Sequence, residues 1–508
     1  MKKNKINKKY LFLFLLSFVI IILISLYLKD RLLYGGIRNE KRPISYLSFD
    51  DLLKLRYLAN PQGNLYHKLQ KQLISPYVFN YPGTGKPRIY KPYVRLAHWN
   101  IERGMNLDII KTLFTNHQSY YYNFKNNIDN DNLLKFKDEL NIFADSDVIS
   151  LNEVDIGMPR TKYKNVVAEL AQALHYNYAF ATEFIELDPL FGEKSNVDPQ
   201  KYIGLHGNAV LSRYPIKSAQ IVRLPQMYKW YETEIRKKSP LESARRMGAK
   251  TVFNQEILSE VRHGSRCALI VDIELPTQEV ITVVSTHLED RCYPDGRFKQ
   301  VQHLLESIKY LRKPVVIAGD FNTSTTDAAP TSFKKEIVKR LKDPHFIARQ
   351  AVLFAIPGLP VAGNLIAGTL SKVFQYKDPA ALSIPVLFPN QERKLFTYIK
   401  NFKFADGEGF DVRGESDKSA NGKRGLLANS NERQLKGFES TFAFEEPRVI
   451  AYYKLDWFFV KPKAGRFEPF NGQTLQLINH GYKSGISDHE PMVVDLSLIK
   501  GYSTVTGR

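Results

Sequence analysis

The chain has 508 residues, of which 44% are hydrophobic, 12% aromatic and 24% charged, which excludes an intrinsically disordered chain. A mean hydropathy of −0.30 excludes a polytopic membrane protein. Two cysteines exclude a disulfide scaffold and a zinc site built on several thiolates. The 72 basic residues outnumber the 52 acidic ones, giving a formal net charge of +20. This charge favours an anionic partner, namely nucleic acid, a phospholipid surface or a phosphorylated substrate.

The N-terminus joins a basic segment, residues 1–10, to an uncharged run at 11–28. At a helical rise of 1.5 Å per residue this run spans about 27 Å, close to the hydrocarbon thickness of a bilayer. Charged residues at 29–31 follow it without a small-residue cleavage site. We therefore expect a transmembrane signal anchor rather than a cleaved signal peptide. The basic segment predicts a cytoplasmic N-terminus, with the bulk of the chain outside the cytosol.

Residues 29–90 are expected to form a juxtamembrane stalk with short helices. Ser48, with Asp51 three residues later, is typical of a helix N-cap. The turn-rich segment 81–87 ends this stalk.

From 91 to 498, β-branched runs of strand length recur between polar loops. The runs are VRLAHW, DVISL, NAVLS, CALIVDIEL, VITVVSTHL, PVVIAGDF, LDWFFV and PMVVDL. Helix-like stretches such as 162–175 and 298–311 lie between them. The mixture indicates an α/β or α+β fold whose strands are buried on both faces. Cys267 and Cys292 lie in this part, and whether they pair stays open because sequence does not give their separation.

A long insertion at about 331–445 interrupts the strand pattern. It begins basic and amphipathic and becomes apolar over 346–370, where Pro357 and Pro360 interrupt any spanning helix. Two interpretations remain open for the apolar part. It is either an interfacial segment that touches lipid or a buried loop-and-helix insertion.

Polar side chains gather at the ends of the strand-like runs. They are Asn100, Glu102, Asn152, Glu153, His287, Glu289, Asp320, Asn322, Asp456, Asp488 and His489. Packed sheets place binding groups at strand ends, where loops converge. One such residue alone is usually a turn former, but six strand ends carrying carboxylate, amide or imidazole groups indicate a site.

The chemistry of these groups fits hydrolysis of a phosphate ester. Oxygen ligands such as Glu153, Asp488 and the amide of Asn100 suit Mg²⁺ or Mn²⁺. His489 is expected to act as general base on a water, with Asp456 holding its tautomer.

Three further groups would act on the phosphate itself. His287 is expected to donate to a phosphoryl oxygen as negative charge develops. Asp320 and Asn322 are expected to position the attacking water or the non-bridging oxygens.

Seven motifs resemble those of the endonuclease/exonuclease/phosphatase (deoxyribonuclease I-like) superfamily and occur in the same order. They are WNIERG (99–104), DVISLNEVD (147–155), HGNAVLSRYPI (206–216), STHLE (285–289), IAGDFNTS (317–324), KLDWFFV (454–460) and SDHEPMVVD (487–495). With its expected anchor, the chain resembles a membrane-anchored bacterial-type member. The resemblance implies a four-layer α/β/β/α sandwich of two mixed sheets, with a single-metal-centred phosphohydrolase site at one edge.

The resemblance also implies a role for each motif residue. The implied catalytic residues are His287, Asp320, Asn322, Asp456 and His489, and the implied ligands of Mg²⁺ or Mn²⁺ are Asn100, Glu153, Asp488 and Glu102. Asn208 and Arg213 of the GNAVLSR motif, and Arg266 before the ALIVDIEL strand, are candidates for substrate binding, with structural packing as the alternative. The insertion leaves about 130 residues between Asn322 and Asp456, so substrate identity does not transfer with the motifs.

Three functions therefore compete. The first is a membrane-anchored phosphodiesterase acting on a lipid headgroup or another small phosphoester, favoured by the anchor and by the apolar part of the insertion. The second is an extracytoplasmic nuclease acting on DNA or RNA, favoured by the net charge. The third is an inactive scaffold, which the presence of Glu153 and His489 disfavours. The sequence does not identify a protein partner.

Overall fold

Helices lie between groups of strands along the chain, as the sequence predicts. The computed structural model describes residues 46–82, 91–187, 197–236, 260–323, 393–411, 438, 441–444, 451–482 and 485–500. The strands are β1 (Tyr77–Phe79), β2 (Tyr93–Asn100), β3 (Val148–Ile156), β4 (Asn177–Glu186), β5 (Leu205–Ser212), β6 (Ile216–Arg223), β7 (Arg262–Gly264), β8 (Cys267–Glu274), β9 (Val280–His287), β10 (Val315–Asp320), β11 (Phe442–Phe444), β12 (Ala451–Tyr453), β13 (Asp456–Lys461), β14 (Pro469–Thr474) and β15 (Met492–Ser497).

The helices, in chain order, lie between or before these strands in the sequence. They are α2 (Phe49–Tyr57), α3 (Gly63–Ile74), α4 (Leu107–Thr115), α5 (His117–Phe124), α6 (Leu133–Ala144), α7 (Val166–Leu174), α8 (Trp230–Ile235), α10 (Pro294–Ile308), α14 (Arg393–Asn401) and α15 (Gln476–His480), with 3-10 turns η1 (Glu102–Gly104), η2 (Lys125–Asn127), η3 (Asn130–Asn132) and η4 (Pro159–Thr161). The helix-like stretches expected at 162–175 and 298–311 correspond to α7 and α10.

Two mixed sheets form the centre of the described part. The larger has the strand order β1-β4-β5-β3-β2-β15-β14, with β7 paired to β4, and the smaller has the order β13-β10-β9-β8-β6. Within the larger sheet β2 runs parallel to β3, and within the smaller β9 runs parallel to β10. The other pairings within these two sheets are antiparallel. The expectation of two mixed sheets is confirmed.

Side-chain alternation along each strand divides the core into two clusters. In β2, Val94 and Leu96 face the smaller sheet and belong to the cluster between the sheets. Ala97 and Trp99 face the other way, into the cluster beneath the helices. This alternation decides which strand-end residues point into the space between the sheets.

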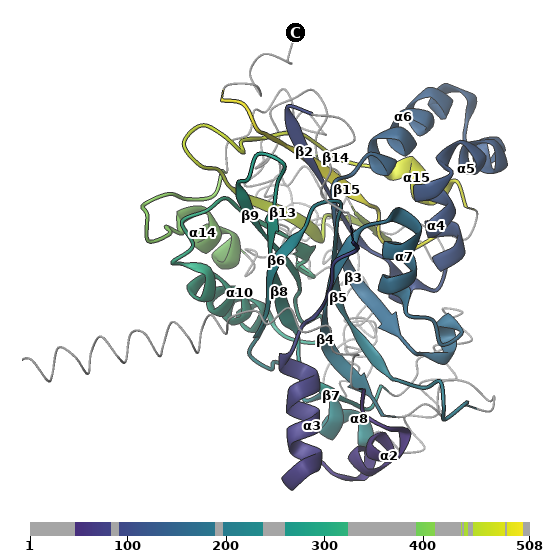
Figure 1. Cartoon of the computed structure of the whole chain (residues 1–508), viewed down its shortest axis with the longest axis vertical. Coiled ribbons are helices and arrows are strands. Elements are labelled where there is room, and N and C mark those ends of the chain that lie inside the picture. The colour runs from purple at the N-terminus through teal and green to yellow at the C-terminus, as the bar shows by residue number, and fades with distance from the viewer. Residues whose placement is uncertain are drawn as a thin grey trace, which may run out of the picture. The chain divides into compact units, whose positions relative to one another are not determined.

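Helices cover the outer face of each sheet (Figure 1). Ile110 of α4, Leu140 of α6 and Val167 of α7 pack in the cluster of the larger sheet. On the smaller sheet, Phe396 of α14 lies against Trp457 of β13, with ring centroids 4.7 Å apart. The arrangement is the expected α/β/β/α sandwich.

The segment expected as a stalk contributes to this sandwich. Ser48 caps α2 through reciprocal hydrogen bonds with Asp51, as the sequence predicts. β1 then pairs with β4, so the sheet begins before the boundary expected at residue 91.

The expected membrane segments lie outside the described residues. These are the apolar runs at 11–28 and 346–370. Among the helices of the described ranges, none is long and apolar enough to cross a bilayer. Cys267 and Cys292 are both free thiols.

Candidate active site

The predicted strand-end residues meet at one edge of the sandwich. The register pairs Asn100 of β2 with Asn152 of β3 and His287 of β9 with Asp320 of β10. Asp456 begins β13 directly opposite Asp320. The two sheets join here, because Nδ2 of Asn100 donates to Oδ2 of Asp320 at 3.2 Å.

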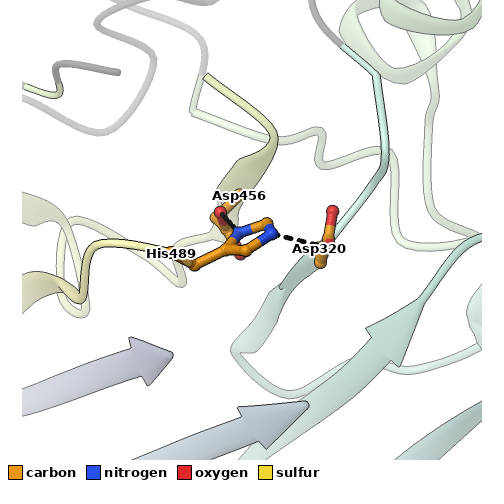
Figure 2. A group of neighbouring side chains, drawn as sticks. All are labelled: Asp320, Asp456 and His489. Carbon is orange, nitrogen blue, oxygen red and sulfur yellow. Dashed lines mark hydrogen bonds and ion pairs between the residues drawn. The ribbon is translucent and has the colours of Figure 1, made fainter. Parts of the chain in front are cut away.

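An imidazole bridges two carboxylates at this edge (Figure 2). Nδ1 of His489 donates to Oδ2 of Asp456 at 2.7 Å, and its Nε2 lies 3.7 Å from Oδ2 of Asp320. Burial opposes a charged imidazole, but the carboxylates of Asp456 and Asp320 outweigh it and hold the pKa of His489 well above its usual range. Burial raises the pKa of Asp320 to about 7. The charge of His489 opposes this rise, and the charge of Asp456 adds to it. The pair can therefore hold and move a proton between Nε2 and Oδ2.

His287 is held as a neutral imidazole. Nη1 of Arg266 lies 2.8 Å from its Nδ1. Burial, and then the charge of Arg266, lowers the pKa of His287 well below its usual range. Nε2 faces the amide of Asn322, 2.8 Å from Nδ2, and lies 3.4 Å from Oδ2 of Asp320. His287 thus places Nε2 at the same point as the His489 pair.

Carboxylates crowd the other side of Asn100. Its Nδ2 lies 3.4 Å from Oε1 of Glu153, and its Oδ1 accepts from the backbone N–H of Glu102 at 3.2 Å. Burial, and then the charges of Asp488 and Glu153, raises the pKa of Glu102 to about 7. Mutual repulsion among hard oxygen ligands is relieved by a divalent cation, so the residues present fit Mg²⁺ or Mn²⁺.

The backbone turns two of these carboxylates toward the edge. The pairing of β3 with β5 shifts between Leu151 and Val154, which is a β-bulge, and Glu153 within it has a φ of 55°. Glu102 has a φ of 46°. Such backbone is strained for residues other than glycine and persists only where the surroundings fix it.

A second group of ligand-type side chains overlaps the acid–base pair. One ligand atom each from Asp320, Asp456 and His489 lies within 4.8 Å of the others. The 2.7 Å hydrogen bond between Asp456 and His489 already engages Nδ1 and Oδ2. The geometry therefore suits proton handling at this point better than metal binding.

The three candidate substrate residues lie in different places. Asn208 is fully buried between Asn152, whose amide donates to it at 2.7 Å, and Glu183, to which it donates at 3.0 Å. Arg266 is buried behind His287 and donates to Glu183 at 2.9 Å.

Arg213 is not brought to this edge. It follows β5, which runs antiparallel to β3, so its backbone N–H bonds to Asp147 at the start of β3. Its guanidinium lies over the Tyr176 ring.

The sequence motifs do not include the residues that hold Asp456 from behind. Oγ1 of Thr441, at the end of the insertion, accepts the backbone N–H of Asp456 at 3.2 Å. His98 contacts Oδ1 of Asp456 at 3.0 Å. The position of His98 in the strand could have indicated it, because His98 follows Val94 and Leu96 at the same two-residue spacing and so faces the smaller sheet.

Comparisons with known proteins place the chain in a family. A family model described as the Endonuclease/Exonuclease/phosphatase family matches residues 97–489. No curated protein matches the chain. Similar solved structures include an endonuclease/exonuclease/phosphatase from Beutenbergia cavernae DSM 12333 (14% identity, 80% of this chain, 72% of that chain, TM-score 0.36). A second is the human Nocturnin catalytic domain with bound sulfate (13% identity, 84% of this chain, 97% of that chain, TM-score 0.35). A third is a mannosyl-6-phosphatase from Bacteroides thetaiotaomicron VPI-5482 (11% identity, 79% of this chain, 99% of that chain, TM-score 0.33).

Proposed function

Because the chain belongs to the Endonuclease/Exonuclease/phosphatase family, whose members hydrolyse phosphoesters, we propose that it is a divalent-metal-dependent phosphodiesterase. One observation carries the proposal. The amide of Asn100 contacts Glu153 on the carboxylate side and Asp320 on the acid–base side. A phosphate bound beside these carboxylates would therefore lie within reach of both histidines.

The residues divide the chemistry between them. Glu153, Asp488, Asn100 and Glu102 would hold Mg²⁺ or Mn²⁺, which supplies charge stabilisation for the phosphate. His287 donates a hydrogen to a phosphoryl oxygen as negative charge develops.

The remaining residues handle the attacking water. Asp320 and His489, with Oδ2 and Nε2 3.7 Å apart, accept its proton and return one to the leaving oxygen. Asp456 holds the His489 tautomer through the hydrogen bond to Nδ1.

For the substrate we propose a lipid headgroup or another small phosphoester. Support comes from the sequence, in the apolar runs at 11–28 and 346–370. The same features favour a single-pass membrane protein with a cytoplasmic N-terminus and the catalytic unit outside. Protease treatment of intact cells tests this orientation, because a unit outside is digested and a cytoplasmic one is protected.

A substrate panel tests the function. The full chain in detergent is incubated with Mg²⁺, with Mn²⁺ or with chelator. The substrates are sphingomyelin and phosphoinositide vesicles, inositol phosphates, supercoiled plasmid and single-stranded RNA. Metal-dependent lipid turnover is the expected result. Plasmid nicking without lipid turnover would assign a nuclease, and inertness toward every substrate would contradict the proposal.

A further inference from the structure

His98 lies behind the acid–base pair, in the middle of the sandwich. Its side chain is 0% exposed and projects from β2 of the larger sheet toward β13 of the smaller one. Nε2 lies 3.0 Å from Oδ1 of Asp456. A carboxylate oxygen only accepts, so His98 Nε2 carries a hydrogen and donates it.

Two imidazoles therefore share the carboxylate of Asp456. Oδ1 accepts from His98 and Oδ2 accepts from Nδ1 of His489 at 2.7 Å. The χ2 torsion of an aspartate has only a broad, weak preference. The plane of this carboxylate is therefore set by its partners rather than by its own rotamer.

His98 is itself fixed from the opposite side. Its Nδ1 accepts from the hydroxyl of Ser150 in β3 at 3.3 Å, and Oγ of Ser150 lies 2.9 Å from Oγ of Ser285 in β9. These hydroxyls are buried and occupy strand positions where an apolar core would otherwise continue. A connected polar network of this kind holds its members in one arrangement.

We propose that His98 is a positioning residue that holds the Asp456 carboxylate in the plane from which Oδ2 meets His489. The catalytic consequence rests on the proposed phosphoester hydrolysis. The orientation itself does not, so it can be read without a substrate.

Two amide variants separate orientation from core filling. In His98→Gln the amide nitrogen reaches the position of Nε2 and keeps a donor to Asp456. In His98→Asn the amide is one methylene shorter and does not reach it. His263→Asn is the matched control, because His263 is buried and bonds the backbone oxygens of Leu55 and Leu58 rather than Asp456.

The full chain in detergent is measured in two ways. Turnover of bis(4-nitrophenyl) phosphate with Mg²⁺ gives kcat and KM, and NMR detects the Nδ1 hydrogen of His489. His98→Asn should lower kcat at least about tenfold, leave KM unchanged and lose the NMR signal. His98→Gln should keep the signal and most of kcat, and His263→Asn should keep both in full.

The outcomes distinguish this inference from the proposed function. Retained kcat and signal in His98→Asn, or equal loss of both in folded His98→Gln, would overturn the inference. Wild-type protein that turns over no phosphoester contradicts the proposed function. In that case the NMR signal of His489 in the two variants still tests whether His98 orients the Asp456 carboxylate. If His98→Asn does not fold, a folded His98→Gln that lacks the signal overturns the inference, and one that keeps it supports it.

Discussion

Replacing Glu102 by glutamine tests whether the carboxylates at the proposed cation site repel one another. Burial, and then the charges of Asp488 and Glu153, raises the pKa of Glu102 from 4.5 to about 7. At about 1.4 kcal/mol per unit this shift corresponds to about 3 kcal/mol, and solvent screening of the partly exposed side chain reduces it to about 1–2 kcal/mol. Because the pKa is higher in the folded state, the protonated Glu102 side chain stabilises the folded protein below pH 4.5. This stabilisation is lost as the pH rises through about 7 and the side chain ionises.

Thermal unfolding in chelator at pH 5 and pH 8 measures this effect. For a unit of this size Glu102→Gln should raise the melting temperature by about 1–2 °C at pH 8, and by less at pH 5, where Glu102 is protonated in the folded protein. Added Mg²⁺ should stabilise the wild type more than the variant. Glu408→Gln, an exposed residue, is the control for loss of one negative charge. Equal melting of Glu102→Gln and wild type at pH 8 in chelator would refute the reasoning.

Three other substitutions probe the site. Asp456→Asn should lower kcat by about 10²–10⁴-fold with little change in KM, and unaltered turnover of an activated phosphodiester would contradict the role of Asp456. Glu153→Gln should weaken Mg²⁺ binding at least about tenfold in calorimetric titration. Unchanged affinity would show that the cation does not bind at Glu153. Thr441→Val deprives the buried N–H groups of Leu455 and Asp456 of their acceptor and should destabilise by about 1–3 kcal/mol in urea unfolding, where an unchanged midpoint would count against it.

The sequence determined the strands and most of the proposed site. Runs such as VITVVSTHL carry their strand signal locally, in β-branched residues of strand length, and the structure has β9 at that position. The capping box of Ser48 and Asp51 is equally local, since both partners lie within one helical turn. The ordered motifs then indicated, through the family resemblance, that these strand ends meet at one edge of the sheets.

Only the tertiary structure decided which polar residues meet across the two sheets. His98 and Asp456 lie 358 positions apart in the chain, and neither residue's neighbours indicate that the other is its partner. Arg213 shares a motif with Asn208, yet the antiparallel direction of β5 carries it to the other end of β3. Contacts of this kind depend on strand direction and sheet packing, which arise from long-range pairing, whereas propensity and alternation act over a few residues.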